Sequence, residues 1–202
     1  MARTASGTYQ IAVLSSGHSR GSNLAAMHTY FEAHGLPVRI ALAVFNRQDS
    51  PAYGLAQDLG IPAMVLATRD MASYETELAR LCKEKGIQLI ALAGFLKQLS
   101  ANFLNAVGIP VLNIHPALLP KYGGRGMYGM AVHQAVWEAG DKVSGATVHR
   151  VDQFYDHGSI IASIQVELSD CHSPEDIAHK VLQQEHKLYA PSIYQFLTKL
   201  QP

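Results

Sequence analysis

The sequence predicts a single α/β domain: a twisted, mostly parallel sheet with helices on both faces, extended by a C-terminal β-hairpin and a last helix. Three observations support this prediction. Short apolar runs alternate with segments of helical periodicity along the first half of the chain. Residues 87–93 form an almost continuous apolar run, which is typical of a strand buried on both faces. Two β-rich runs separated by a turn signal follow later.

The first half of the chain alternates expected strands and helices. We expect strands at residues 10–16, 38–45, 63–66 and 87–93, and helices at 22–32, 52–59 and 71–85. In the first helix Leu24, Met27 and Phe31 recur at helical spacing. Gly60 and Gly86 follow the other two helices at the position where glycine commonly ends a helix.

The second half begins with a strand and then changes character. We expect strands at residues 109–114, 145–151 and 160–168 and a helix at 131–139, with proline and glycine clustered between 116 and 129. Residues 156–158, Asp-His-Gly, favour a turn, so the last two strands form a hairpin. Ser173 caps the final helix, Pro174 fits its first turn, and the acidic residues that follow favour its dipole.

Composition limits the classes of function. Hydrophobic residues make up 48% of 202, which excludes a disordered chain. Lys and Arg number 16 and Asp and Glu number 16, whereas a protein that neutralises many nucleic-acid phosphates is normally basic. No apolar run reaches the roughly 20 residues of a membrane span, and no signal peptide is evident. We therefore expect no nucleic-acid partner and no membrane association.

Cysteine and histidine usage favours a cytoplasmic protein without a metal. Cys82 and Cys171 belong to no CxxC pattern, so they are expected to be reduced thiols. The ten histidines are scattered, and no HExxH or similar ligand spacing occurs.

The loop after the first strand, residues 15–23, is the first candidate binding site. Gly17 and Gly21 free the backbone N–H groups at the start of the first helix, and such groups bind anions. Arg20 adds a cation, which favours a phosphate. The run matches neither GxGxxG nor the P-loop pattern. A tight turn in which Ser or Asn caps the helix is the structural alternative.

Asn113 and His115 are the second candidate. They lie at the carboxyl end of an expected buried strand, the edge where open α/β sheets bind ligands. Strand alternation places both side chains on the same side. An amide donor beside an imidazole can hold a developing oxyanion, and the imidazole can exchange a proton near neutral pH. A structural capping pair is the alternative.

The roles of two acidic residues depend on where the fold places them. Asp156 favours a His115 imidazolium if its turn folds back over that residue; otherwise it is ordinary turn chemistry, as is nearby Asp152. Glu185 lies on the apolar stripe of the last helix with Val181 and Leu188. A carboxylate there needs a partner, either a Lys or Arg or a ligand such as ribose hydroxyls.

Several segments together resemble the folate-dependent formyltransferases. The segments are NIHPALLPKY at 113–122, GATVH at 145–149 with Asp-His-Gly at 156–158, SG…GSNL at 16–24, AGFL at 93–96 and QEH at 184–186. The first two are typical of the whole superfamily, and the last three favour its glycinamide ribonucleotide branch. The resemblance runs from about residue 11 to about 194, nearly the whole chain.

The resemblance implies a Rossmann-like formyltransferase domain over residues 1–202. Residues 1–108 would form the nucleotide- and phosphate-binding half, and 109–202 the catalytic and folate-binding half. The implied reaction belongs to de novo purine biosynthesis. The amine of 5′-phosphoribosylglycinamide attacks the formyl group of 10-formyltetrahydrofolate directly, through a tetrahedral intermediate. No metal is implied.

The resemblance also implies a role for each candidate residue. Asn113 and protonated His115 would hold the oxyanion, while Asp156 would stabilise the imidazolium and help to order water. The phosphate would bind Gly21, Ser22 and Asn23 with help from Arg20, and Glu185 would hold the ribose. The folate pocket would include Leu96, Lys97, Gln98, Leu99, Val151 and Asp152.

The chain departs from the family pattern in three places. His18, Ser19 and Arg20 lengthen the phosphate loop. Residues 123–130 form a longer, glycine-rich segment, which we expect to be a mobile cover over the amine site. Lys97 and Gln98 replace a usual Arg–Ile pair, which affects folate affinity rather than the chemistry.

Relatives with the same Asn–His–Asp set remain as alternatives. Methionyl-tRNA formyltransferases carry a further C-terminal domain, formyltetrahydrofolate hydrolases an N-terminal regulatory domain, and sugar-nucleotide formyltransferases are longer. The expected elements fill residues 10 to about 200, which favours the glycinamide ribonucleotide branch. A non-catalytic nucleotide- or folate-sensing domain is the alternative of another class. We expect two small-molecule substrates, a cytoplasmic location, and a monomer or homodimer.

Overall fold

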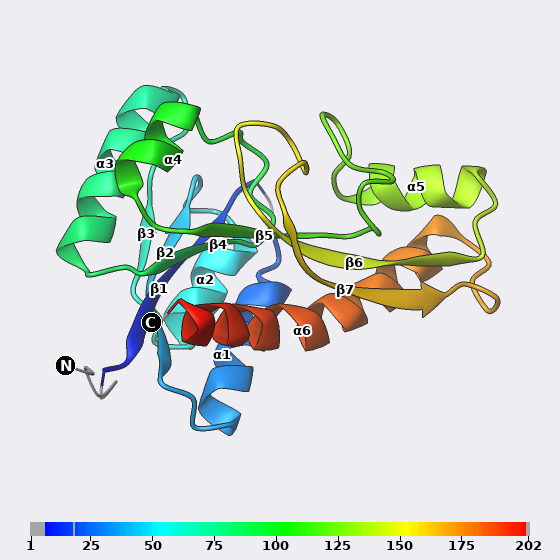
Figure 1. Cartoon of the computed structure of the whole chain (residues 1–202), viewed down its shortest axis with the longest axis horizontal. Coiled ribbons are helices and arrows are strands. Elements are labelled where there is room, and N and C mark those ends of the chain that lie inside the picture. The colour runs from blue at the N-terminus through cyan, green and yellow to red at the C-terminus, as the bar shows by residue number, and fades with distance from the viewer. Residues whose placement is uncertain (1–6, 18, 201–202) are drawn as a thin grey trace.

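A computed structural model of the chain describes residues 7–17 and 19–200 (Figure 1). His18, which the sequence places in the phosphate loop, lies outside the described residues. A seven-stranded sheet crosses the molecule in the order β3-β2-β1-β4-β5-β6-β7. Strands β1 to β5 pair in parallel, and β6 and β7 continue the sheet as an antiparallel hairpin. The predicted fold class is confirmed.

The elements follow the predicted order with one addition. They are β1 (Tyr9–Ser15), α1 (Ser22–Ala33), β2 (Val38–Phe45), α2 (Pro51–Asp58), β3 (Ala63–Val65), α3 (Met71–Glu84), β4 (Leu89–Leu92), α4 (Ala101–Val107), β5 (Val111–His115), α5 (Met130–Glu138), β6 (Val143–Arg150), β7 (Ile160–Glu167) and α6 (Pro174–Lys199). Helix α4 was not predicted. It has only seven residues, and although Phe103, Leu104 and Val107 face the core, so short a segment does not establish a helical period.

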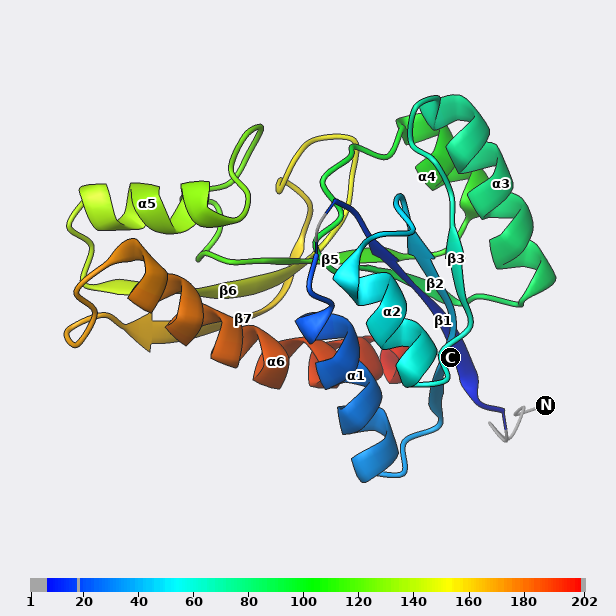
Figure 2. The same cartoon turned by 180° about the vertical axis from the view of Figure 1, so that it is seen from behind.

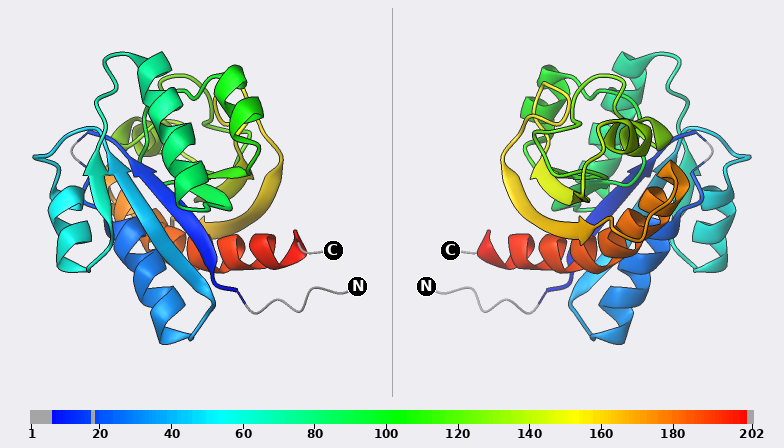
Figure 3. Two further views of the ribbon diagram at one scale, coloured as in Figure 1. Left: turned by 90° about the vertical axis from the view of Figure 1, so that its left-hand side faces the viewer. Right: turned by 90° about the vertical axis from the view of Figure 1, so that its right-hand side faces the viewer.

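Side chains of the central strands alternate between two cores. Ile11 and Val13 join the core under α1, α2 and α6, whereas Ala12 and Leu14 join the core under α3 and α4. Figures 2 and 3 show these helices on opposite faces of the sheet. Because both faces are covered, the central strands are apolar at nearly every position. This is the physical reason for the continuous apolar run at residues 87–93.

The chain changes direction across the sheet between β1 and β4. The segments that follow these two strands start next to each other, where the Ser16 N–H donates to the Gly94 carbonyl at 3.1 Å, and then lead to helices on opposite faces of the sheet. Crevices of this kind are where open α/β sheets bind ligands. The predicted phosphate loop and the predicted folate segment 96–99 both start here.

Helix α6 begins as predicted. Ser173 Oγ accepts from the Asp176 N–H at 3.1 Å, and Pro174 occupies the first turn. The helix runs along the sheet and buries Ile177, Val181 and Glu185. Within the described ranges, no helix is both long and apolar enough to traverse a lipid bilayer.

Candidate active site

A cavity of about 640 Å³ opens where β5 ends, between the loops after β4 and β6 and one face of α6. It brings together residues that are far apart in the sequence. The predicted site residues that line it are Asn23, Leu96, Lys97, Gln98, Leu99, Asn113, His115, Val151, Asp152, Asp156 and Glu185. Residues 124–130 of the glycine-rich segment also line this cavity.

Asn113 lies opposite His149 in the antiparallel pairing of β5 with β6. The Asn113 Nδ2 atom is 3.0 Å from His149 Nε2. His149 Nδ1 is 3.1 Å from the Arg150 carbonyl, which can only accept, so Nδ1 carries the ring proton. His149 Nε2 is then an acceptor for Asn113. This bond orients the amide, with its NH₂ group on the side of His149.

His115 is buried at the end of β5. Its Nε2 atom is 2.8 Å from the Tyr122 carbonyl, which can only accept, so Nε2 carries a proton. In the neutral ring Nδ1 then has no proton, and it lies 3.5 Å from Asp156 Oδ1. Burial lowers the pKa of His115. The Asp156 charge and the hydrogen bond to the Tyr122 carbonyl oppose that effect, but the pKa of His115 still lies below its ordinary value. Near neutral pH the free imidazole is therefore mostly neutral.

Asp156 folds back over His115, the condition that gives this residue a role beyond its turn. Its Oδ1 atom lies 3.5 Å from both His115 Nδ1 and His149 Nε2, and its Oδ2 accepts the Gly124 N–H at 3.0 Å. Burial alone would raise the pKa of Asp156. His149 and His115 in their imidazolium forms, together with the Gly124 N–H, outweigh that effect and bring the pKa below the ordinary value. The carboxylate is ionised at neutral pH. A Cβ at Gly123 would lie 3.2 Å from the Asp156 Cβ, so the close approach favours glycine.

The phosphate loop leaves the start of α1 open. Gly21 is the N-cap residue, with φ of 77°, and makes no side-chain cap hydrogen bond. The alternative in which a Ser or Asn side chain caps this helix is therefore wrong. A second cavity of about 80 Å³ lies against this turn and is lined by Gly21, Ser22 and Asn23. Arg20 is exposed on the same loop and is not among the residues that line either cavity.

Glu185 is buried and pairs with Asn23. Its Oε2 atom accepts from Asn23 Nδ2 at 2.7 Å. The partner is an amide rather than the Lys or Arg considered from the sequence. Burial raises the pKa of Glu185 to about 7, despite the Asn23 hydrogen bond. The pair joins the start of α1 to α6 at one end of the main cavity.

The opposite end of the cavity is formed by the segments after β4 and β6. Gln98 Nε2 donates to the Gln153 carbonyl at 2.6 Å and so joins the two segments. Asp152 Oδ1 accepts the Phe154 N–H at 2.8 Å, and its Oδ2 lies 2.9 Å from His157 Nδ1. Asp152 thus stabilises its own turn as well as lining the cavity.

Two histidines of the cavity were not predicted as site residues. His149 holds Asn113, and only the register of β6 against β5 could have revealed that pairing. His133 projects from α5 into the cavity; burial first, and then His115, lower its pKa to about 4. Its Nδ1 atom has no hydrogen-bond partner in the part of the chain that the structure describes.

Residues 9–193 match the family model described as formyl transferase. The chain belongs to the formyl transferase family. Curated relatives of this formyl transferase include "Phosphoribosylglycinamide formyltransferase, chloroplastic" of Arabidopsis thaliana, which is 38% identical over 184 residues and 89% of this chain. The Haemophilus influenzae protein named phosphoribosylglycinamide formyltransferase is 32% identical over 94% of this chain and 87% of its own. The chain spans 62% of the Arabidopsis protein and 58% of the Vigna unguiculata one.

Solved structures of the family share the whole fold of this formyl transferase. Glycinamide ribonucleotide transformylase 1 from Symbiobacterium toebii superposes with a TM-score of 0.85 at 29% identity, covering 95% of this chain and 89% of its own. The Geobacillus kaustophilus protein of the same name gives 0.84 at 31% identity, with 94% and 99% covered.

Proposed function

We propose that this chain transfers the formyl group of 10-formyltetrahydrofolate to the amine of 5′-phosphoribosylglycinamide, a step of de novo purine biosynthesis. The observation that carries the proposal is the convergence of Asn113, His115 and Asp156 in a cavity that also contains Asn23 and Glu185. Relatives named for this activity support the choice of substrates.

The two ends of the cavity suit two different ligands. At one end the N–H groups of the first turn of α1 are free of a side-chain cap and favour an anionic phosphate. Glu185 is beside them and can accept from ribose hydroxyls. At the other end Leu96 and Leu99 offer apolar surface for a folate ring system, and Lys97 offers a cation for its carboxylates. The volume lies within the roughly 300–1,000 Å³ of small-molecule sites.

The catalytic residues would move one proton and stabilise one developing charge. When bound, 10-formyltetrahydrofolate supplies the electrophilic formyl carbon and a nitrogen leaving group. Asn113 donates to the formyl oxygen as it gains negative charge, and His115 stabilises the same oxyanion once it is protonated. Neutral His115 accepts at Nδ1 the proton that the attacking amine gives up, and it returns that proton to the leaving nitrogen. Ionised Asp156 stabilises the imidazolium in between.

The remaining parts of the proposal concern organisation. We propose that residues 1–108 mainly bind the ribonucleotide and 109–202 mainly the folate, although Glu185 reaches the nucleotide end through Asn23. We also propose a metal-independent, cytoplasmic enzyme, monomeric or homodimeric, that does not bind nucleic acid. The two free thiols, Cys82 and Cys171, agree with a reducing compartment.

An absorbance assay of folate deformylation, run with and without phosphoribosylglycinamide, tests the reaction. Product that forms only with the amine present supports the transferase. Folate turnover without the amine would instead favour a hydrolase, in which water replaces the amine. Ligand binding with no turnover would favour a sensing domain or a different amine acceptor.

A further inference from the structure

A chain of hydrogen bonds leads away from His115 to residues outside the cavity. The first link is the Tyr122 carbonyl, 2.8 Å from His115 Nε2. Tyr122 has φ of 58°, in the left-handed region that is unfavourable for a residue with a Cβ. A relaxed backbone would point this carbonyl elsewhere, so another contact must stabilise the observed conformation.

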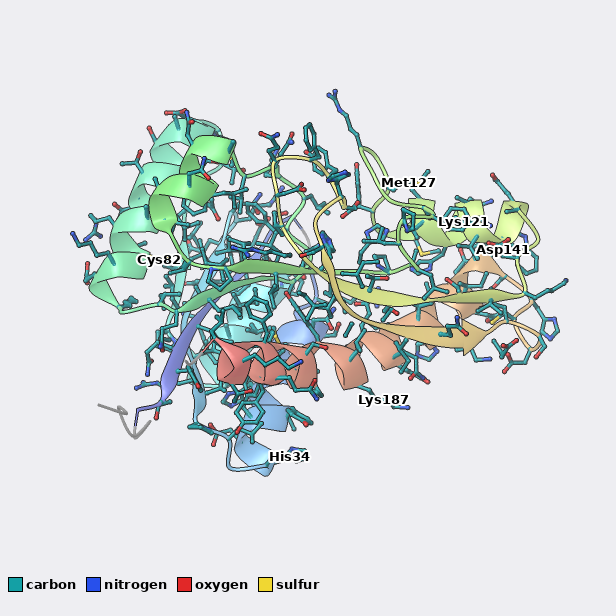
Figure 4. The ribbon with its side chains drawn as sticks, viewed as in Figure 1. His34, Cys82, Lys121, Met127, Asp141 and Lys187 are labelled. Atoms are coloured by element: carbon teal, nitrogen blue, oxygen red, sulfur yellow. The ribbon has the colours of Figure 1, made fainter. Side chains whose placement is uncertain are left out.

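The Tyr122 side chain supplies that contact. Its hydroxyl donates to Asp141 Oδ2 at 2.8 Å, and its ring packs against the core. Lys121 Nζ lies 2.8 and 2.6 Å from the two Asp141 oxygens. Hydrogen bonds from Lys121 and Tyr122 lower the pKa of Asp141, so it is an ionised acceptor at neutral pH. Figure 4 shows Lys121 and Asp141 side by side near α5.

The end of α5 fixes Asp141 in place. Gly140, with φ of 65°, donates its N–H to the Trp137 carbonyl at 3.0 Å, and the Asp141 N–H points to the Val136 carbonyl at 3.4 Å. These two bonds form a Schellman motif, a rigid helix ending. Asp141 is therefore attached to a well-packed helix rather than to a free loop.

We propose that Tyr122 and Asp141 are positioning residues for His115. The phenol–carboxylate bond holds Tyr122 in its left-handed conformation, and the Tyr122 carbonyl keeps the His115 proton on Nε2. The Nδ1 atom then stays free and directed at Asp156, where the proposed mechanism needs it. Neither Tyr122 nor Asp141 is among the residues that line the cavity, so both would act through His115 rather than on substrate. The inference rests on the proposed role of His115.

Removing the hydrogen bond between Tyr122 and Asp141 should slow the chemical step and leave substrate binding unchanged. We expect Tyr122→Phe and Asp141→Ala each to lower kcat by about 10- to 100-fold, the scale of small misplacements of a catalytic group. KM for both substrates should change by less than about twofold. Asp141→Asn keeps an oxygen acceptor for the phenol, so it should recover most of the lost kcat.

A spectroscopic measurement tests the same idea without relying on activity. In ¹⁵N-histidine-labelled wild-type protein, the His115 signals, assigned by comparison with His115→Ala, should show a proton on Nε2 alone. Tyr122→Phe and Asp141→Ala should show a mixture of both tautomers. If the wild-type protein transfers no formyl group, the proposed function is wrong. The tautomer measurement does not depend on activity, so it still tests whether Tyr122 and Asp141 position His115.

The matched control is Asp170→Ala, which removes an exposed carboxylate paired with Lys180 before α6, away from the cavity. It should keep the wild-type kcat. Wild-type kcat in both Tyr122→Phe and Asp141→Ala would overturn the proposal, as would a loss of kcat with unchanged His115 signals. If Tyr122→Phe fails to fold, the two Asp141 variants decide, because Asp141 is a partly exposed polar side chain outside the hydrophobic core.

Discussion

Replacing Glu185 with Gln should stabilise the protein at neutral and alkaline pH. Burial raises the pKa of this carboxyl from 4.5 to about 7. At about 1.4 kcal/mol per pKa unit, keeping the carboxylate ionised in the folded state costs about 3 kcal/mol. Gln has nearly the same shape, keeps an oxygen to accept from Asn23, and carries no charge.

The pH dependence gives the sign of this effect. Below pH 4.5 the carboxyl is protonated in both the folded and the unfolded chain, so Glu and Gln should be nearly equal in stability. Between pH 4.5 and about 7 the unfolded chain loses the proton first, and the advantage of Gln grows. Above pH 7 it is complete, and it should raise Tm by about 6–12 °C for a chain of this size.

Thermal melts of both proteins at pH 5, 7 and 9 measure this difference. With its one oxygen bonded to Asn23, Gln presents an NH₂ donor in place of the second carboxylate oxygen, the proposed acceptor of the ribose hydroxyls. KM for the ribonucleotide should therefore rise, while KM for the folate stays near the wild-type value. A stability difference that is equal at all three pH values, or a variant less stable than wild type at pH 9, would refute the argument from burial.

Three further predictions concern the site and the hairpin. His115→Ala and Asp156→Asn should each lower kcat by about 10²–10⁴-fold in a folded protein, and near-normal turnover in either would remove that residue from the mechanism. Gly145→Ala would place a Cβ 2.0 Å from the Ile164 carbonyl oxygen, so urea denaturation should show a loss of more than about 3 kcal/mol; unchanged stability would contradict the close strand pairing. Treatment with EDTA should leave the rate unchanged, whereas inactivation restored by a divalent cation would show a metal requirement.

The fold could be predicted because its signals are local. Buried parallel strands are apolar throughout, and the glycines and Ser173 mark helix ends within a few residues of each boundary. Helix α4 was not predicted because its seven residues are too few to establish a helical period. The two-residue differences at several strand ends reflect where hydrogen bonding to a neighbour stops, which depends on the partner strand.

The site could be predicted only in part, because its contacts join distant segments. Alternation along one strand was enough to place Asn113 and His115 together. The pairing of Asn113 with His149 depends on the register of β6, and that of Glu185 with Asn23 depends on how α6 crosses the sheet. No sequence pattern encodes either. Arg20 stays a prediction: its side chain is exposed in the phosphate loop and lines neither cavity, so only a bound phosphate would show whether the guanidinium contacts it.

The glycine-rich wall of the cavity is anchored at both of its ends. Gly124 is bonded to Asp156 at one end, and helix α5 begins at Met130 at the other. The five residues between these anchors can change in length or composition without moving the reacting groups. Substrate range could therefore diversify in this segment during evolution, or be altered by design, while the chemistry beneath it is conserved.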